Sequence, residues 1–70
     1  MDAGKILGAN VKRERERLGL TQEGLGHACD LNMTEISRLE HAKRDARLTT
    51  IVKVARGLGL SPSQLLDGIP

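Results

Sequence analysis

The sequence predicts an all-α fold, a compact bundle of five short helices in one domain. Apolar residues recur at helical spacing throughout the 70 residues. Capping residues and glycines divide this pattern into five pieces, and the connections between the pieces are only a few residues long. A chain of this length supports a single small hydrophobic core.

The first helix is expected over residues 3–18. Its inward face carries three apolar residues at helical spacing: Leu7, Val11 and Leu18. Gly19 follows as a helix-ending residue. Glu14 interrupts the apolar stripe, so its carboxylate must either reach out to solvent or pair with a cation, and the sequence leaves both open.

The second helix is short, with Thr21 as its N-cap and its end near Cys29. Its apolar set consists of Leu25, Ala28 and Cys29. Gly24 and Gly26 lie inside it, and each weakens a helix by roughly 0.5–1 kcal/mol relative to alanine. Because glycine is best tolerated in a helix where another backbone passes close by, we expect a tight crossing at Gly26.

The third helix, over residues 33–41, has the best-marked start in the chain. Asn32 is its N-cap, and Glu35 has the spacing that returns a capping-box hydrogen bond. Leu31 and Ile36 have the spacing of a hydrophobic staple. The preceding residues therefore form a turn that leads directly into a capped helix.

The two faces of this third helix differ in character. At about 100° per residue, Ile36 and Leu39 point inward, with Glu40 beside them. The outward face carries Thr34, Ser37, Arg38 and His41, with Met33 and Glu35 at its margins. Any surface helix has a polar outer face, and a charge cluster is usually just solvated, so this face alone indicates no ligand.

The fourth helix is expected over residues 48–58 and is ended by Gly59. Its inward set is Leu48, Ile51, Val52, Ala55 and Leu58. A short fifth helix follows, with Ser61 as its cap, Pro62 in its first turn and Gln64 to close a capping box. It contributes two apolar residues, Leu65 and Leu66.

Composition excludes several classes of function. Phe, Trp and Tyr are absent, which leaves little room for a deep ligand cavity and none for base-stacking platforms. The net charge is only +2, but residues 12–17 and 38–44 each carry a basic excess. A single cysteine, Cys29, fits a reducing compartment. Signal-peptide and membrane-spanning patterns are absent, so we expect a small soluble cytoplasmic protein, complete as one domain over residues 1–70.

Enzyme chemistry is not expected. The only candidates for metal binding or nucleophilic chemistry are His27, Cys29 and His41. His27 and Cys29 are about 200° apart around a helix and cannot grip one ion together. The glycines are scattered singly, so no phosphate loop is formed. We therefore expect no catalysis, no metal and no cofactor.

A different function is indicated by the second and third helices together. Residues 21–41 form a short helix, a tight turn and a second capped helix, a helix-turn-helix that presents its second helix to a DNA major groove. The outward residues suit base edges: Arg38 can fork onto guanine, Thr34 and Ser37 can donate or accept, and Met33 can touch a thymine methyl. Cations and helix-start amides flank this face as phosphate contacts would: Gln22, Asn32, Lys43 and Arg44.

Two stretches of the chain resemble the lambda-repressor/Cro-like helix-turn-helix family, often called the XRE family. They are LGANVKRERERLGLTQEGLGHACDLNMTEISRLEHAKR, residues 7–44, and LTTIVKVARGLGLSPSQLL, residues 48–66. The motifs GLTQ, IS.LE, AKR and GLSPSQLL carry the resemblance in that order. The turn DLN.T.IS is similar to that of the small controller proteins of restriction–modification systems and similar stand-alone regulators.

The resemblance implies a five-helix DNA-binding domain that acts as a dimer on palindromic operators. It implies Gln22 on a backbone phosphate, residues 33, 34, 37 and 38 toward bases, and Lys43 with Arg44 on the flanking backbone. The family often pairs an arginine of its first helix with a glutamate that ends its third, and here these are Arg15 and Glu40. The helical wheels also put Arg15 at the edge of the first apolar stripe, so we interpret the pair as structural.

The sequence departs from the family at three positions. Asp30 and Ala42 stand where glycine is usual, and Arg47 replaces a small polar cap. Asp30 can adopt a left-handed conformation, whereas Ala42 is less comfortable if its φ must be positive. Glu35 lies near the expected groove, where it could accept from a cytosine amino group or serve the cap; its spacing from Asn32 favours the cap.

The sequence leaves two questions about binding partners open: DNA or a protein, and the contact of a homodimer. The same fold could serve a protein partner, as an antitoxin-like module or adaptor without specific DNA binding. The convergence of Gln22, Arg38, Lys43 and Arg44 on one face favours DNA over that alternative. A homodimer is expected because one helix reads only half a site, and residues 64–70, QLLDGIP, with Ile69 as an exposed apolar end, are the expected contact.

Overall fold

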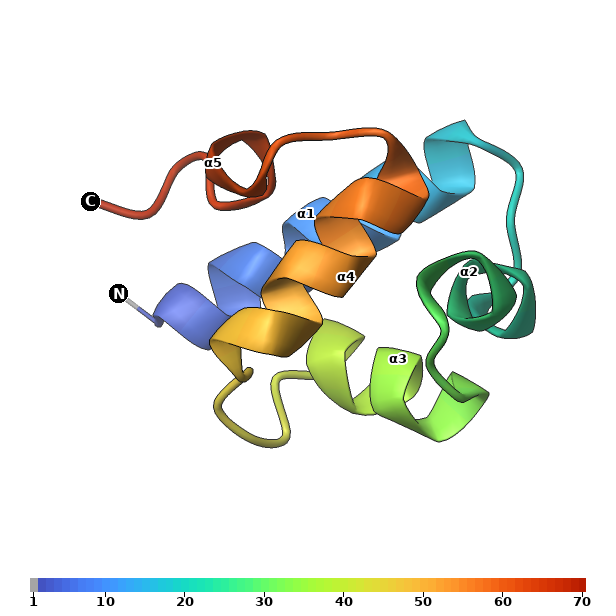
Figure 1. The fold of residues 1–70 in the computed structure, drawn as a ribbon. Helices are drawn as coiled ribbons and strands as arrows, with labels where there is room; N and C mark the ends of the chain where they lie inside the picture. Colours follow the sequence, from blue (N-terminus) through green and yellow to red (C-terminus); the bar gives the residue numbers. More distant parts are fainter. Residues whose placement is uncertain (1) are drawn as a thin grey trace.

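The computed structural model describes residues 2–70, and this part of the chain is all-helical, as predicted. Its elements are α1 (Ala3–Arg17), α2 (Gln22–Cys29), α3 (Met33–Glu40), α4 (Leu48–Leu58) and α5 (Pro62–Leu65). Figure 1 shows their arrangement in a body of 29 × 21 × 20 Å. Each predicted helix is present, with ends within a residue or two of the expected ones.

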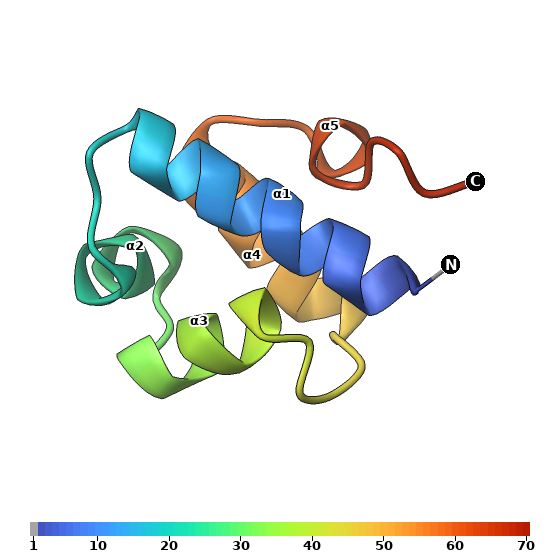
Figure 2. The ribbon, with the colours of Figure 1, turned by 180° about the vertical axis from the view of Figure 1, so that it is seen from behind.

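α1 and α4 occupy the middle of the molecule, between α3 and α5. α3 packs on α1 and α2, whereas α5 packs on α1 and α4. Figures 1 and 2 show α3 and α5 on opposite sides of the central pair, from the front and from behind. The second helix of the predicted helix-turn-helix and the C-terminal tail therefore belong to different faces of the protein.

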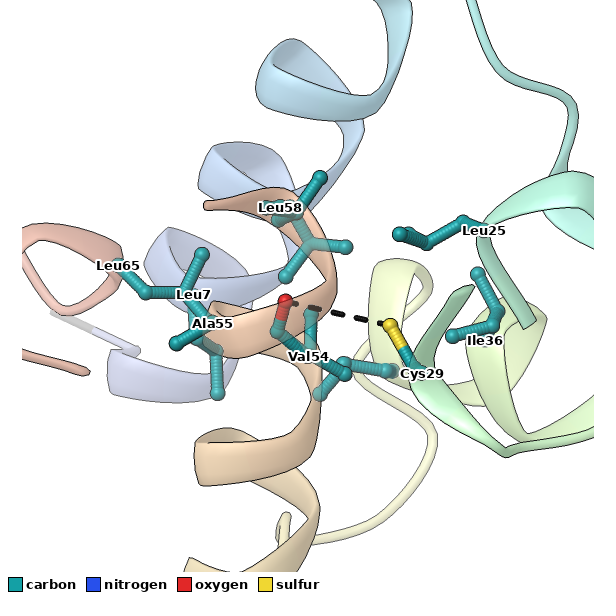
Figure 3. Packing of buried hydrophobic residues seen from close by; sticks show 10 residues of the cluster. Leu7, Leu25, Cys29, Ile36, Val54, Ala55, Leu58 and Leu65 are labelled. Atoms are coloured by element: carbon teal, nitrogen blue, oxygen red, sulfur yellow. Dashed lines mark hydrogen bonds between the residues drawn. The ribbon is translucent and has the colours of Figure 1, made fainter. Parts of the chain in front are cut away.

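The core lies where α4 meets the other helices. Its buried apolar residues are Leu7, Val11, Leu25, Cys29, Ile36, Leu39, Val54, Ala55, Leu58 and Leu65. Figure 3 shows Leu25, Cys29 and Ile36 on one side of α4 and Leu7 with Leu65 on the other. The Cys29 thiol lies 3.9 Å from the carbonyl oxygen of Val54. The buried aliphatic side chains and the Cys29 thiol therefore form one continuous hydrophobic core.

Three residues that the helical pattern assigned to the core lie outside it. Leu18 is 43% exposed, Leu48 is 72% exposed, and Ala28 is also exposed. Leu18 follows the last residue of α1, where the chain turns away at Gly19, which has a φ of +71°. Leu48 is the first residue of α4. The predicted apolar faces of these two helices therefore reached too far, to positions at the helix ends that other helices do not cover.

One core residue was missed for a related reason. Val54 is fully buried although the expected inward face of α4 did not include it. α4 packs against α1, α2 and α5, so its buried face is wider than the stripe of a helix that meets one partner. Val52, which was expected inward, is only half-buried.

Local side-chain caps begin three of the helices as predicted. The Thr21 hydroxyl accepts from the N–H of Gly24 at 2.9 Å, and the Asn32 side-chain oxygen accepts from the N–H of Glu35 at 2.8 Å. Ser61 and Gln64 form the complete reciprocal box that was expected for α5. At α3 only half of the box exists among the described residues, because the Glu35 side chain returns no bond to Asn32.

The predicted close approach at Gly26 is confirmed. A Cβ added at Gly26 would lie 2.6 Å from the carbonyl oxygen of Leu31, so the backbone of the turn itself passes over this glycine. A second close approach was not anticipated: at Gly8, an added Cβ would lie 2.7 Å from the carbonyl oxygen of Leu39 and 2.6 Å from that of Glu40. The backbone of α1 therefore touches the end of α3 directly.

A buried polar side chain attaches the C-terminal segment to α1. Asn10 is buried, and its side-chain nitrogen donates to the carbonyl oxygens of Leu65 at 2.9 Å and Asp67 at 2.8 Å. Both carbonyls lie at the end of α5, where no further helical turn could satisfy them. Ile69 is half-buried against the core, so the expectation of an exposed apolar end there is wrong.

Candidate nucleic-acid interface

α2, the turn at residues 30–32 and α3 form the expected helix-turn-helix. Asp30 ends α2 with a φ of 59° and a ψ of 44°, the left-handed conformation that aspartate tolerates. The N–H of Leu31 then donates to the carbonyl oxygen of Gly26 at 2.8 Å. This tight turn starts α3 at Met33, immediately after its cap. α3 is held through Ile36 and Leu39, and its opposite face is free.

The four predicted base-reading residues lie on that free face. Met33 is 52% exposed, Thr34 and Arg38 are exposed, and Ser37 is half-buried. They offer, in order, an apolar surface, a hydroxyl, a second hydroxyl and a guanidinium. This set can make both hydrogen bonds and methyl contacts with base edges.

His41 at the end of α3 has a defined ring orientation. Its Nδ1 lies 2.8 Å from the carbonyl oxygen of Ser37 and 3.5 Å from the Ser37 hydroxyl. Because a carbonyl oxygen only accepts, Nδ1 carries the hydrogen. The ring therefore turns its Nε2 away from the helix backbone and stays on the exposed surface.

The predicted phosphate contacts fall into two kinds. Lys43 and Arg44 are exposed in the loop after α3, and Asn32 is exposed at its start, with its side-chain oxygen used by the cap. Gln22 is different: it is half-buried, and its Nε2 donates to Glu40 Oε1 at 3.2 Å. Sequence reasoning missed this bond, because the two residues are far apart in the chain.

Arg15 and Glu40 are in contact beside this glutamine. Arg15 Nε donates to Glu40 Oε2 at 2.6 Å, and Arg15 Nη2 donates to Glu40 Oε1 at 3.0 Å. Their side chains are 12% and 3% exposed, respectively. The hydrogen bond to Glu40 raises the pKa of Arg15, against the opposing effect of burial. The arginine is thus a permanent cation that neutralises a nearly buried carboxylate.

A groove between α3 and α4 was not anticipated. Its volume is about 310 Å³, and its lining residues are Glu35, Arg38, Leu39, Arg44, Asp45, Ala46, Arg47 and Thr50. Arg47 stands at the N-cap of α4 but gives no side-chain cap hydrogen bond. The only sequence signal was the unusual arginine at that cap. Three arginines therefore converge beside the start of α4, with two acidic residues among them.

The charged run along α1 is a separate feature. Glu14 Oε1 accepts from Arg17 Nε at 2.9 Å, and Glu14 Oε2 lies 3.5 Å from Arg13 Nε. The hydrogen bond from Arg17 lowers the pKa of Glu14, and partial desolvation opposes it. Of the two alternatives for this residue, the structure therefore shows pairing with cations.

Residues 2–70 provide neither a metal-binding cluster nor a membrane-spanning helix. No group of three or more His, Cys, Asp and Glu side chains in this range lies close enough together to hold a metal ion. The longest apolar stretch of any helix described there is too short to cross a membrane.

Comparison with known proteins agrees with this geometry. The family model described as Helix-turn-helix matches residues 11–65, a range that includes α2, the turn, α3 and α4. The chain is 36% identical over 63 residues to the control protein C.BamHI of Bacillus amyloliquefaciens, covering 89% of this chain and 78% of that protein. It is 33% identical to the HTH-type transcriptional regulator y4dJ of Sinorhizobium fredii, covering 94% and 86%.

Two solved structures share this fold over most of the chain. The hypothetical transcription factor NHTF from Neisseria superposes with a TM-score of 0.88 at 34% identity, over 93% of this chain and 75% of that one. The restriction-modification controller protein C.AhdI from Aeromonas hydrophila superposes with a TM-score of 0.85 at 27% identity, over 89% and 94%.

Proposed function

This chain belongs to the helix-turn-helix family of DNA-binding transcriptional regulators, and we propose that it recognises one specific operator as a homodimer, with α3 in the major groove. The observation that carries the proposal is the free face of α3. Four side chains suited to base edges lie there, and exposed cations follow directly in the loop at its end. This order matches what a recognition helix needs, with bases along the helix and phosphates beyond it.

Arg38 is the main base contact in this proposal. Its guanidinium is exposed on α3 and can donate two parallel hydrogen bonds to O6 and N7 of a guanine. Thr34 and Ser37 contribute hydroxyls, and Met33 contributes contact with a thymine methyl. Glu35, on α3, lines the groove toward α4 and does not close its capping box, so it is available to accept from a cytosine amino group.

The phosphate contacts come from both sides of α3. Lys43 and Arg44 follow it, and Asn32 precedes it with its amide nitrogen still available. Gln22 lies at the start of α2, where backbone N–H groups also lack helical partners. Such contacts fix the position of α3 on the duplex without reading sequence.

Dimerisation would bring two copies of α3 to the DNA, one for each half-site. One copy of α3 spans only a few base pairs, and two copies related by a two-fold axis read a palindrome with half-sites about one helical turn apart. We assign the contact to residues 64–70, which lie on the side of the molecule away from α3 and so leave the reading face free. Their free apolar surface is small, because Ile69 already packs on its own core. A monomeric mass at high micromolar concentration, without DNA, would count against this assignment.

A selection experiment tests the proposal. The protein is titrated into a labelled pool of random-sequence duplexes at two salt concentrations, with fluorescence anisotropy as readout, and the retained duplexes are sequenced. Enrichment of a palindrome with half-sites about one helical turn apart is expected. Weak binding that higher salt abolishes, with no sequence enriched, would instead assign the helix-turn-helix to a protein partner.

A further inference from the structure

The ion pair of Arg15 and Glu40 joins four parts of the protein: α1, the loop before α2, α2 and α3. Glu40 ends α3 and accepts from Arg15 of α1 through both of its oxygens. Glu40 Oε1 also accepts from Gln22 Nε2, at the first residue of α2. Arg15 Nη1 in turn donates to the carbonyl oxygen of Leu20 at 2.9 Å, in the loop that leads into α2. The start of α2 is therefore held by a network that centres on the end of α3.

This network determines which way the Gln22 amide faces. A carboxylate can only accept hydrogen bonds, so the nitrogen of the amide, and not its oxygen, must face Glu40. An amide nitrogen carries two hydrogens, and the bond to Glu40 uses one of them. The second N–H remains available beside the first turn of α2.

Gln22 lies at the start of α2, where its second N–H can donate to a phosphate together with the free backbone N–H groups. The Thr21 hydroxyl occupies the N–H of Gly24, whereas the backbone N–H groups of Gln22 and Glu23 precede any helical acceptor. A phosphate at this helix start would accept from these backbone groups, and a donating side-chain amide would add to them. An amide turned the other way would present its oxygen and repel the phosphate.

We propose that Glu40 is a positioning residue for DNA binding, which holds the Gln22 amide so that its second N–H donates to a backbone phosphate. Arg15 acts one step further away, by fixing Glu40 through two bonds. The inference rests on the proposed function, because it deepens the role of a phosphate contact. It gives the Arg15–Glu40 pair a part in binding besides its part in packing.

A comparison of two backgrounds tests the inference. Gln22→Met removes the amide at similar length, and its effect on the Kd for the selected duplex is measured in the wild-type protein and in Glu40→Gln. In the wild-type protein we expect about a tenfold loss, the size of one hydrogen bond to a charged group. In Glu40→Gln the loss should fall below about threefold, because residue 40 can then present either an oxygen or a nitrogen to Gln22.

A matched background separates this effect from charge. Asp45→Asn also removes one negative charge, from the exposed loop after α3, but Asp45 does not contact Gln22 among the described hydrogen bonds. The tenfold effect of Gln22→Met should survive there. An effect of equal size in the Glu40→Gln and wild-type backgrounds would overturn the inference, as would no effect of Gln22→Met in either.

Nuclear magnetic resonance of the wild-type protein provides a test that needs no variant to fold. One side-chain amide proton of Gln22 should be protected from solvent exchange in the free protein, and the other only after the duplex is added. Equal, fast exchange of both protons in the complex overturns the inference. Failure of the proposed function is distinguishable, because the wild-type protein would then select no duplex at all.

Discussion

Arg15 and Glu40 meet through two hydrogen bonds although 25 residues separate them in the chain. The contact joins the last turn of α1 to the last residue of α3, in a place where the Glu40 side chain is only 3% exposed. Neither ion could remain there alone without a large loss of hydration. The pair therefore couples the orientation of α3 to the stability of the domain.

Removing either partner should destabilise the protein. Arg15→Ala leaves a nearly buried carboxylate without its cation, and we expect the free energy of unfolding to fall by about 2–4 kcal/mol. Urea denaturation followed by circular dichroism measures the change. The replacement of both residues, Arg15→Met with Glu40→Leu, should recover much of the loss, since no uncompensated charge remains.

The exposed ion pairs of Glu14 with Arg13 and Arg17 provide the matched control for the buried Arg15–Glu40 pair. Arg17→Ala breaks its shorter ion pair, but Arg17 is 55% exposed and solvent screens the pair, so the free energy of unfolding should change far less than for Arg15→Ala. If the urea midpoint moved as far for Arg17→Ala as for Arg15→Ala, burial would not be what makes the Arg15–Glu40 pair important.

Two glycines in α2 should respond differently to alanine. Gly26→Ala brings a Cβ within 2.6 Å of the Leu31 carbonyl oxygen, and displacement of the turn should cost about 1–3 kcal/mol. At Gly24 the nearest atom would be the Thr21 hydroxyl at 3.3 Å, which can shift, so the gain in helix propensity keeps the net change within about 1 kcal/mol. Thermal unfolding of both variants decides; a Gly26→Ala protein as stable as wild type would contradict the close approach.

The protein should become more stable when Ala42 is replaced by glycine. Its φ is 53°, a left-handed conformation that costs an alanine about 1–2 kcal/mol. After the greater freedom of glycine in the unfolded chain is subtracted, Ala42→Gly should gain about 0.5–1 kcal/mol and raise the Tm by a few degrees. Asp30→Gly, with a φ of 59°, should gain less, because aspartate tolerates this region better. A lower Tm for Ala42→Gly would contradict the argument.

Loss of a base contact should change the sequence preference, whereas loss of a phosphate contact should change the overall affinity and its salt dependence. Arg38→Ala should cost about 1–3 kcal/mol on the preferred duplex and relax selection at one base position. Lys43→Ala should weaken binding to all duplexes alike and reduce the slope of log Kd against log salt by about 1. Repeating the duplex selection with both variants separates the roles; an unchanged sequence preference for Arg38→Ala would remove that residue from base recognition.

The Cys29 thiol should be unreactive while the protein is folded. Burial raises the pKa of Cys29 above its ordinary value of 9.0, so the folded protein holds less of the reactive thiolate. The raised pKa gives a stability contribution that is present below pH 9 and is lost as the pH rises through the folded pKa. At pH 8, reaction with an aromatic disulfide should be at least about a hundredfold slower than in urea. Equal rates would show that this part of the core opens freely.

The helix ends were predictable because their signals are local. Thr21, Asn32 and Ser61 each lie three residues before the N–H that they accept from, and this spacing is visible in one dimension. The outward face of α3 followed from helical periodicity in the same way. Its role in DNA binding was indicated by the helix-turn-helix pattern and by the residue types on that face, and then by the family resemblance; the match of the family model over residues 11–65 supports a DNA-binding domain.

Features that depend on packing between distant segments were not predictable. Val54 is buried because three helices surround α4, and Asn10 is buried because the end of α5 returns to α1. The bond from Gln22 to Glu40 arises only when α2 and α3 fold against each other. Leu48 shows the reverse case, since an apolar residue at helical spacing remains in solvent where its helix begins.

The direct backbone contact at Gly8 has a consequence for how this protein can evolve. Any side chain at that position would push the end of α3 away from α1, so the support of the recognition helix admits almost no variation. Met33, Thr34 and Arg38 are exposed and take no part in that support. Under the proposed function, new operator preferences would therefore arise by substitution along α3 while the fold beneath it stays unchanged.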